Sequence, residues 1–475
     1  MNKKQQREPV TKRKQRKIKQ RERRILAQQR AEKQRLATEE KRGIVIQLCK
    51  TIRHFFPDLF LWLKEIEDFR RKSEYELAEL ITACITMHLL KSGSRNSFNN
   101  LRKEAKFKKN YENLFHLRLP HPDTVDNVMR HLPEEVLEQL KKKMLCSLLE
   151  MKSLHKYRFL GKWFTVAIDG TGVVSFDHDH CDQCLHNTSK KGKTKHFHNV
   201  LEAKLVTPNG FSISLATQWI ENPVGEYDKQ DCERKAFTRL AEKLKKNYPR
   251  LPMCLLVDGL YPYQGFFETC KTNDWVYIAT FKDGCLPTVW REKAELLPLM
   301  PDNHRQERSY QGKTTTERKY SWVNDIDYHG HCLHWIECLE TIEKENGECQ
   351  TTRFSQVTNI PPCYRIITGL LATGRMRWKI ENEGFNQQKN GGYKMQHKFA
   401  RKSYLALKNY YQCLQIAHMI NQLLILSSQF QAHLKGKITI KHLWLCLNGE
   451  LIWGDIDTMA LVNLSKQKIQ IRFVE

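Results

Sequence analysis

The sequence contains no long hydrophobic run that could cross a membrane. Its longest uncharged stretch, residues 409–434, is interrupted by polar side chains, among them Gln412, Gln415, His418, Asn421, Gln422 and Ser427. A membrane-spanning helix needs about 20 predominantly apolar residues, so we expect a buried helix here. The chain also opens without the charged, apolar and small-residue regions of a secretory signal. We therefore expect a cytoplasmic protein with no membrane partner.

Acidic residues are few beside the basic ones. The 475 residues include 79 Lys and Arg against 53 Asp and Glu, which gives a formal net charge of +26. This excess favours a polyanionic partner, and nucleic acid is the first candidate. The 15 cysteines are scattered and several lie within apolar patterns, so we expect reduced thiols. The length allows two or three domains with a substantial core.

The first 42 residues have very few large apolar side chains. They contain 17 Lys or Arg and 5 Glu, so this arm alone carries a charge of +12. We expect residues 1–42 to be disordered, or to form a helix on a polyanion. As a solvated tail or as a specific DNA contact, the arm would raise non-specific affinity and make binding salt-dependent.

Residues 43–156 have helical periodicity, with apolar side chains that recur three and four positions apart over 136–149. They predict an all-helical N-terminal domain that binds DNA. Its basic residues include Arg95, Arg102, Lys103, Lys106, Lys108 and Lys109. A helix-turn-helix reader and a generic helical bundle with a charged face both remain open.

Residues 157–300 alternate between strand and helix patterns. The run FTVAID precedes a loop rich in His, Cys and Lys, and then VLEAKLVT and FSISLATQWI predict an antiparallel pair. A helix is expected over 231–248, and further strands over 253–258 and 276–281. Three antiparallel strands followed by strands that must cross over to join them predict an α/β fold with a mixed sheet.

Residues 301–360 interrupt this scheme with short strand-like runs and Gly and Asn turns, which predict a β-rich insertion. The α/β pattern resumes over 361–475. A helix is expected over 366–388, in which Gly374 is a weak point, and a long apolar helix over 403–429.

Two aspartates follow apolar strand patterns and precede glycine, Asp169 in AIDG and Asp258 in LVDG. We expect both at the exposed ends of strands, where neighbouring strands would bring together two hard oxygen ligands for magnesium. A third carboxylate, Glu381, lies in a helical stretch. Arg377 is four residues before it and Lys389 about two turns after it, which predicts a carboxylate and two cations on roughly one helix face.

Other acidic residues compete with these three. Glu383 lies two residues after Glu381 and would point to a different helix face. Asp177, Asp179 and Asp182, in the loop after the first strand, are weaker alternatives.

The three acidic motifs together resemble the DDE transposases of bacterial insertion sequences. The matching residues are Asp169 in AIDGTG, Asp258 in LLVDGLY and Glu381 in RWKIENEGFNQQKN. In the branch that this sequence resembles, the glutamate belongs to a Tyr, Arg, Glu, Lys signature. Arg377 and Glu381 keep its spacing, whereas Gly374 stands at the Tyr position and Gln388 at the Lys position, one residue before Lys389.

The resemblance covers roughly residues 155–430. It implies a ribonuclease H-like catalytic domain with a β-rich insertion between the second and third carboxylates. Within that insertion, Trp322 or Trp335 would either stack on a displaced base or belong to the core.

The activity that the resemblance implies is DNA cleavage and strand transfer. Asp169, Asp258 and Glu381 would hold two Mg²⁺ or Mn²⁺ ions, with Asp169 bridging both, for in-line attack at phosphorus. Arg377, with Lys389, would contact a phosphate of the DNA. The expected partners are the double-stranded transposon ends and the target, bound by at least a dimer, in a bacterial cytoplasm and associated with the nucleoid.

Two other functions remain open. A nuclease of the same fold would hydrolyse DNA without joining it. A transposase-derived protein that only binds DNA would be expected to have lost a carboxylate, and all three are present.

A separate cluster of soft ligands follows the first strand: His178, His180, Cys181, Cys184, His186, His196 and His198. Cys181 and Cys184 have the CxxC spacing of a zinc knuckle, and two of the histidines would complete a tetrahedral site. The alternative is a loop that collected such residues by chance. Any zinc here would be structural.

Overall fold

The structure is a computed structural model that describes residues 43–434, 438–456 and 471–473, together with Arg24, residues 26–28 and Met459. The predicted basic arm, residues 1–42, therefore lies outside the described residues except for those four positions.

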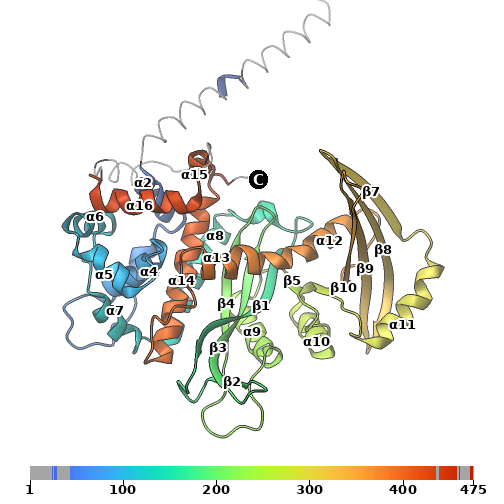
Figure 1. Cartoon of the computed structure of the whole chain (residues 1–475), viewed down its shortest axis with the longest axis horizontal. Coiled ribbons are helices and arrows are strands. Elements are labelled where there is room, and N and C mark those ends of the chain that lie inside the picture. The colour runs from blue at the N-terminus through green and yellow to red at the C-terminus, as the bar shows by residue number, and fades with distance from the viewer. Residues whose placement is uncertain are drawn as a thin grey trace, which may run out of the picture.

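A ten-stranded mixed sheet runs through the described chain in the order β2-β3-β1-β5-β6-β10-β9-β8-β7, and β4 pairs with β3 (Figure 1). Its first strands are β1 (Phe164–Phe176), β2 (Leu185–Thr188), β3 (Thr194–Val206) and β4 (Ser212–Ile220). β1 is antiparallel to β3 and parallel to β5 (Met253–Val257), which is parallel to β6 (Val276–Thr280). The predicted α/β class with a mixed sheet is confirmed, as is the antiparallel β3–β4 pair.

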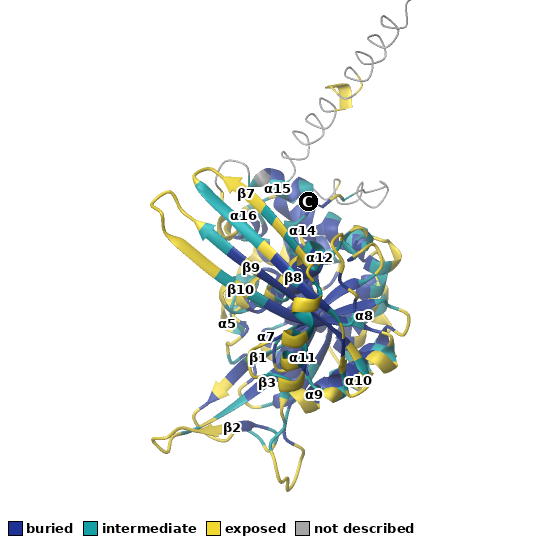
Figure 2. Ribbon diagram, turned by 90° about the vertical axis from the view of Figure 1, so that its right-hand side faces the viewer, coloured by how far each residue is buried: buried dark blue, intermediate teal, exposed yellow. Residues whose placement is uncertain are grey.

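Four long antiparallel strands extend the sheet: β7 (His304–Gln311), β8 (Thr314–Tyr328), β9 (His331–Glu343) and β10 (Cys349–Thr358). The helix α11 (Pro287–Leu296) and the turn η2 (Leu297–Leu299) precede them. β10 is antiparallel to β6, so the strand-rich segment continues the same sheet. Figure 2 shows β8, β9 and β10 buried near the centre of the molecule and more exposed toward their far ends, whereas no residue of β7 is buried.

Residues 43–156 form the helices α2 (Ile44–Phe55), α3 (Leu59–Lys64), α4 (Leu77–Leu89), α5 (Arg95–Lys103), α6 (Ala105–Phe115), α7 (Pro122–Met129) and α8 (Glu134–Glu150), and η1 (His155–Tyr157) follows. Local signals fix some of their ends. The Ser94 hydroxyl accepts a hydrogen bond from the Ser97 N–H at 3.1 Å and caps α5. Glu76 and Glu79 form a capping box at the start of α4.

The long helix α14 (Tyr404–Ile425) joins these helices to the sheet. The Asn409 side chain donates to the backbone carbonyls of Met129 and Leu132, while the side-chain Oε1 of Gln422 accepts from the Ser212 N–H of β4. α15 (Ser428–His433) and α16 (Ile440–Trp453) follow, and α16 packs on α2 and α6. No helix among the described residues is long and apolar enough to span a bilayer.

Side chains alternate between two hydrophobic clusters along β5, because successive strand residues point to opposite faces. Met253, Leu255 and Val257 belong to the larger cluster, which also holds the N-terminal helices, α14 and α9 (Glu233–Asn247). Cys254 and Leu256 belong to a smaller cluster under α12 (Ile367–Arg375). The helix α10 (Gln264–Asn273) connects β5 to β6.

The helix expected over 366–388 is divided. After α12 come the 3₁₀ turn η3 (Met376–Trp378), the π-helix η4 (Ile380–Phe385) and α13 (Asn386–Asn390). Figure 1 shows α12 and α13 running across the centre of the molecule, between α14 and strands β7–β10. These segments carry Arg377, Glu381 and Lys389 to the sheet.

Candidate active site

Asp169 lies in the middle of β1, so the expectation that it stands at a strand end is wrong. β1 continues to Phe176 because its backbone stays paired with β3 as far as His196. Its pairing with β5, however, stops at Ala167 opposite Leu256. Two residues further on, Asp169 comes beside Asp258, the first residue after β5. The end of β5 therefore leaves Asp169 accessible within a continuous strand.

The direction of Asp169 follows from the strand period. Ala167 belongs to the cluster that packs under α12, and Asp169, two residues on, points to the same face. η4 covers this face, since its Ile380 and Phe385 belong to the same cluster. Glu381, the residue after Ile380, thus approaches the two aspartates from the helical layer.

Gly384 permits the close approach of η4 to the sheet. A Cβ atom at this position would lie 2.9 Å from the Ser212 hydroxyl of β4 and 3.4 Å from Cδ of Lys204. A side chain at this position would therefore have to displace the Ser212 hydroxyl or move η4 away from β4. A π turn is a rare local structure that is frequent at functional sites.

The structure brings the three predicted carboxylates together. Asp169, Asp258 and Glu381 line one open cleft of about 860 Å³. The cationic residues that line the same cleft are Lys282, Arg353, Arg375 and Arg377. Asp283 also lines the cleft and pairs with Arg353. The three predicted carboxylates and the remaining cations form a site that could hold metal ions and a phosphate.

The carboxylates influence one another's charge. Burial raises the pKa of Asp169, the Arg377 guanidinium opposes this shift, and the negative charges of Asp258 and Glu381 add to it. Asp169 Oδ2 accepts a hydrogen bond from Arg377 Nη1 at 2.9 Å, and Oδ1 accepts one from the Gly170 N–H at 3.0 Å. The cluster therefore favours a bound cation that would balance its charge.

Asp258 is held in place by its own loop. Its Oδ1 accepts a hydrogen bond from the Leu260 N–H at 2.9 Å, and Lys282 Nζ lies 3.5 Å from its Oδ2. The residue stays partly exposed, with 29% of its side chain accessible. Asp258 therefore presents its Oδ2 to the cleft, where the contact of this oxygen is with the exposed Lys282.

Both predicted DNA-binding cations contact the carboxylates. Arg377 bonds Asp169, and Lys389 Nζ lies 3.8 Å from Glu381 Oε1. Gln388, at the position where the family signature has lysine, is fully buried and its Nε2 donates to Gln415. A π turn takes one residue more than an α turn, and this places Lys389, and not Gln388, beside Glu381.

A further carboxylate near the site, Glu233, does not line the cleft but is close enough to feel the charges of Asp169 and Asp258, and it was not predicted from the sequence. Burial, followed by the charges of Asp169 and Asp258, raises the pKa of Glu233 to about 7. Glu233 is in the first turn of α9, and a Cβ on Gly170 would lie 2.3 Å from its Oε1. Two features of the sequence could have pointed to Glu233. It is an acidic residue in the first turn of the helix that follows the third long strand, and Asp169 is followed by a glycine, which leaves room for another side chain nearby.

The tryptophan at the cleft is Trp378. Its side chain is 57% exposed, and the Arg377 guanidinium lies 4.5 Å from the centre of its ring. Trp322 and Trp335 are buried in the two hydrophobic clusters, and the Trp335 indole donates to Ser355 at 2.9 Å. Their assignment to the core is confirmed, and neither exposes a face to a base.

The competing acids lie elsewhere. Glu383 pairs with Lys379 at 3.1 Å, and its Cγ lies 4.0 Å from the position that a Cβ would take on Gly210. Asp177 pairs with Lys193 and Asp179 with His196, and Asp182 is exposed in the same loop. None of these four residues lines the cleft.

A second, strongly basic cleft of about 650 Å³ lies between the N-terminal helices and the segment before α14. Its cationic lining consists of Arg95, Arg130, Lys398, Arg401 and Lys402. Arg95 and Arg130 both contact Asp126. Among the described residues, Arg401 and Lys402 have no acidic partner, so this end of the cleft carries uncompensated positive charge.

The structure also gathers part of the predicted soft-ligand cluster. His180, Cys181, Cys184 and His198 offer ligand atoms within 4.8 Å of one another. His178, His186 and His196 are not part of this group. All 15 cysteines of the chain are free.

A scan against protein-family models and a search of curated proteins found no match to this chain.

Proposed function

We propose that this protein is a transposase that binds the ends of its own element, cuts them and joins them to target DNA. The observation that carries the proposal is the meeting of Asp169, Asp258 and Glu381 in one cleft beside Arg377. They come from three separate parts of the sequence. The order of the strands supports a ribonuclease H-like fold for this domain, because β1 lies between an antiparallel β3 and a parallel β5.

The carboxylates fit a pair of divalent cations. They supply hard oxygen ligands, and the raised pKa of Asp169 reflects burial and acidic neighbours that a cation would offset. Two Mg²⁺ or Mn²⁺ ions, when bound, would activate a water or a DNA 3′-hydroxyl and stabilise the leaving oxygen. Asp169, Asp258 and Glu381 would hold them, and Glu233 adds a further negative charge at the same place.

Arg377 would contact a DNA phosphate only after it leaves its present partner, Asp169. Its guanidinium donates to Asp169 Oδ2, an oxygen of a carboxylate that would hold the cations. Release of this oxygen would free Arg377 for a phosphate, to which a guanidinium can donate two parallel hydrogen bonds. Lys389 would act similarly beside Glu381.

Trp378 is placed to interact with an unpaired base. Its exposed ring lines the same cleft as the carboxylates, and an aromatic face stabilises an unstacked base by about 1–3 kcal/mol. In the proposed function, Trp378 therefore takes the role that the sequence suggested for Trp322 or Trp335. The basic cleft would hold duplex DNA that leads to the active site.

The test uses the purified full-length protein and a linear duplex that carries the DNA flanking its reading frame, with Mg²⁺ or Mn²⁺. We expect cleavage at the element ends and joining of the cut ends to a target plasmid. Asp169→Asn, Asp258→Asn and Glu381→Gln should each lower the cleavage rate by about 10³-fold or more, because each removes charge that organises the transition state. DNA binding should stay within about twofold, since phosphate contacts provide most of the affinity.

Asp177→Asn is the matched control, because this acid is exposed and lies outside the cleft. Cleavage that survives at any of the three positions would remove that residue from the site. Cleavage without joining, even when precut ends are supplied, would indicate the nuclease. Binding without cleavage by the unaltered protein would indicate a protein that only binds DNA.

A further inference from the structure

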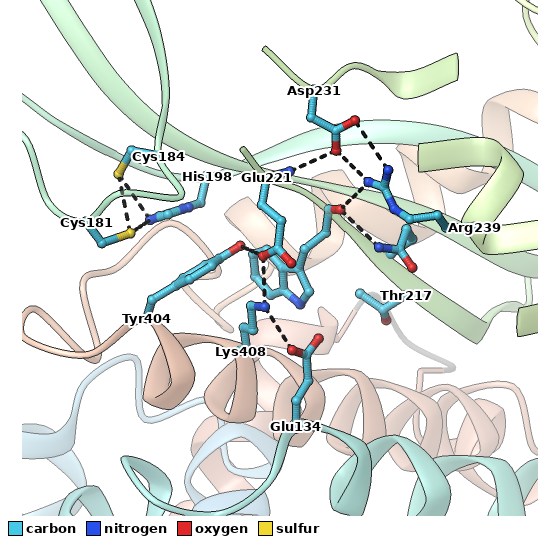
Figure 3. Close-up of polar contacts among 12 residues, drawn as sticks. Glu134, Cys181, Cys184, His198, Thr217, Glu221, Asp231, Arg239, Tyr404 and Lys408 are labelled. Atoms are coloured by element: carbon cyan, nitrogen blue, oxygen red, sulfur yellow. Dashed lines mark hydrogen bonds and ion pairs between the residues drawn. The ribbon is translucent and has the colours of Figure 1, made fainter. Parts of the chain in front are cut away.

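Four potential metal ligands meet at the end of β1 that lies away from Asp169. Cys181 and Cys184 come from the loop between β1 and β2, His180 from the same loop, and His198 from β3. The two sulfurs are 3.8 Å apart, and His198 Nε2 lies 3.6 Å from Cys181 Sγ and 3.3 Å from Cys184 Sγ. His180 Nδ1 lies 3.4 Å from His198 Nε2. Figure 3 shows both cysteines directed at His198.

These separations match the edges of a tetrahedral zinc site. With Zn–S of about 2.3 Å and Zn–N of about 2.0–2.1 Å, tetrahedral angles place two sulfurs about 3.8 Å apart, sulfur and nitrogen about 3.5 Å apart, and two nitrogens about 3.3 Å apart. The sulfurs are too distant for a disulfide, in which they lie about 2.05 Å apart.

The surroundings orient the ligand atoms. His180 Nε2 lies 3.0 Å from the carbonyl oxygen of Arg401, so it carries the proton and leaves the Nδ1 lone pair free for a metal. The ring of His198 stacks on Tyr404, with centroids 3.9 Å apart, and His180 stacks on Phe176 at 4.2 Å. The Cys184 N–H donates to the Cys181 carbonyl at 3.0 Å, which closes the CxxC turn.

We propose that His180, Cys181, Cys184 and His198 bind one structural Zn²⁺. Both thiols would lose their protons to solvent on binding, and both histidines would bind as neutral imidazoles. Four protein ligands leave no open position, so this ion would not take part in catalysis.

The ion would fasten the loop after β1 to β3, whose His198 stacks on Tyr404 at the start of α14. Through Tyr404, the site adjoins a chain of polar contacts in which the Tyr404 hydroxyl donates to Glu221, and Lys408 lies 2.8 Å from both Glu221 and Glu134 (Figure 3). Through His180, it holds the backbone of Arg401, a residue of the basic cleft. The zinc would therefore fix one wall of that cleft.

Metal analysis of the purified full-length protein tests the proposal. We expect about one zinc per chain, and near-complete loss of zinc in Cys181→Ser, Cys184→Ser and His198→Ala. The control is Cys332→Ser, because Asp325, Cys332 and His334 form the other group of potential ligands found among the described residues. This variant should keep its zinc.

X-ray absorption at the zinc edge gives a second readout that does not depend on how well the variants fold. The unaltered protein should show two sulfur ligands at about 2.3 Å and two nitrogen ligands at about 2.0–2.1 Å. Zinc-free protein that takes up none when Zn²⁺ is supplied, a coordination shell without sulfur, or loss of zinc only in Cys332→Ser would overturn the proposal.

The zinc site is independent of the proposed transposase activity. Asp169→Asn should keep its full zinc content, because Asp169 lines the active-site cleft and is not one of the four proposed zinc ligands. Removal of zinc with a chelator should accelerate hydrogen exchange over residues 177–184 and 396–403. No such change is expected in β7–β10, none of whose residues belongs to the ligand group.

Discussion

Two carboxylates at the candidate active site, Asp169 and Glu233, lie in an environment that disfavours their ionised forms. Burial and the neighbouring acids raise the pKa of both Asp169 and Glu233. Arg377 compensates Asp169, but no cation contributes to the shift of Glu233. In the absence of a bound cation, ionisation of Glu233 therefore opposes folding.

The pH dependence of the free energy of unfolding, measured without divalent ions, should reveal this unfavourable ionisation of Glu233. The pKa of Glu233 rises from 4.5 to about 7 on folding, so the folded protein binds more protons than the unfolded chain between these values. This contribution to stability is present at low pH and is lost as the pH rises toward and past 7. We expect Glu233→Gln to raise the melting temperature at pH 8 in the presence of a chelator, with a smaller change at pH 5.

Glu242→Gln, at an exposed position of the same helix, is the control for this measurement. Differential scanning calorimetry on both variants at the two pH values is sufficient. Equal effects of the two substitutions at pH 8 would contradict a role for Glu233 in the acidic cluster.

Among the secondary-structure elements, the π-helix η4 has the largest influence on the site. Its extra residue per turn places Lys389 beside Glu381, and Gly384 allows it to lie against β4 and Lys204. Lys204 Nζ in turn donates to Gln415 of α14, so η4 lies between the sheet and the long helix. Small shifts of η4 would therefore move Glu381 relative to the aspartates.

A methyl group at Gly384 should disturb both folding and catalysis. Its Cβ would come within 2.9 Å of the buried Ser212 hydroxyl, so Gly384→Ala is expected to destabilise the fold by about 1–3 kcal/mol. Gly449→Ala in α16 is the matched control, because no atom lies within 4 Å of its Cβ position. This control should stabilise the protein by up to about 1 kcal/mol, since alanine favours helix.

Urea unfolding of both variants measures these changes, and cleavage at saturating DNA measures the effect on Glu381. A Gly384→Ala variant with unchanged stability would show that η4 can move away from β4 without cost.

At the scale of the whole molecule, positive charge gathers where the N-terminal helices and the sheet share one hydrophobic core. In the proposed function, this is where DNA would bind. α14 packs on both the N-terminal helices and β4, and the larger hydrophobic cluster runs through all of them. The basic cleft lies where these parts meet, and Lys398, Arg401 and Lys402 form one side of it. A duplex bound there would contact the N-terminal helices and the segment before α14 at the same time.

Replacement of Lys398 and Lys402 by alanine should weaken duplex binding in a salt-dependent manner. Each phosphate contact that is lost should reduce the slope of log affinity against log salt by about 0.9. The control is the double substitution of Lys246 and Lys271, two exposed lysines on α9 and α10 outside the basic cleft. Affinities for duplex DNA are measured by fluorescence anisotropy at several salt concentrations. Equal slopes of log affinity against log salt for the two double variants would contradict the prediction, because they would show that only the net charge matters.

The sequence by itself determined most strands and helices and the identity of the three central carboxylates, but neither the division of the helix over 366–388 nor the end of β1. Apolar runs that end in Asp-Gly marked β1 and β5, and the spacing of Arg377, Glu381 and Lys389 placed them on one side of a helical segment. Such local patterns suffice because strand and helix periods are properties of neighbouring residues. The turn that brings Cys181 and Cys184 together was predictable for the same reason, because its CxxC spacing is a local pattern.

Only the tertiary structure decided which groups meet. Asp169 stands beside Asp258 because β5 stops where β1 continues. This depends on the pairing of residues that lie 89 positions apart in the sequence, as the register pair Ala167 and Leu256 shows. Glu233 and Trp378 joined the site, and His180 and His198 were selected from five histidines, through packing between distant segments. No local period encodes these contacts, because they arise when separate elements share one core.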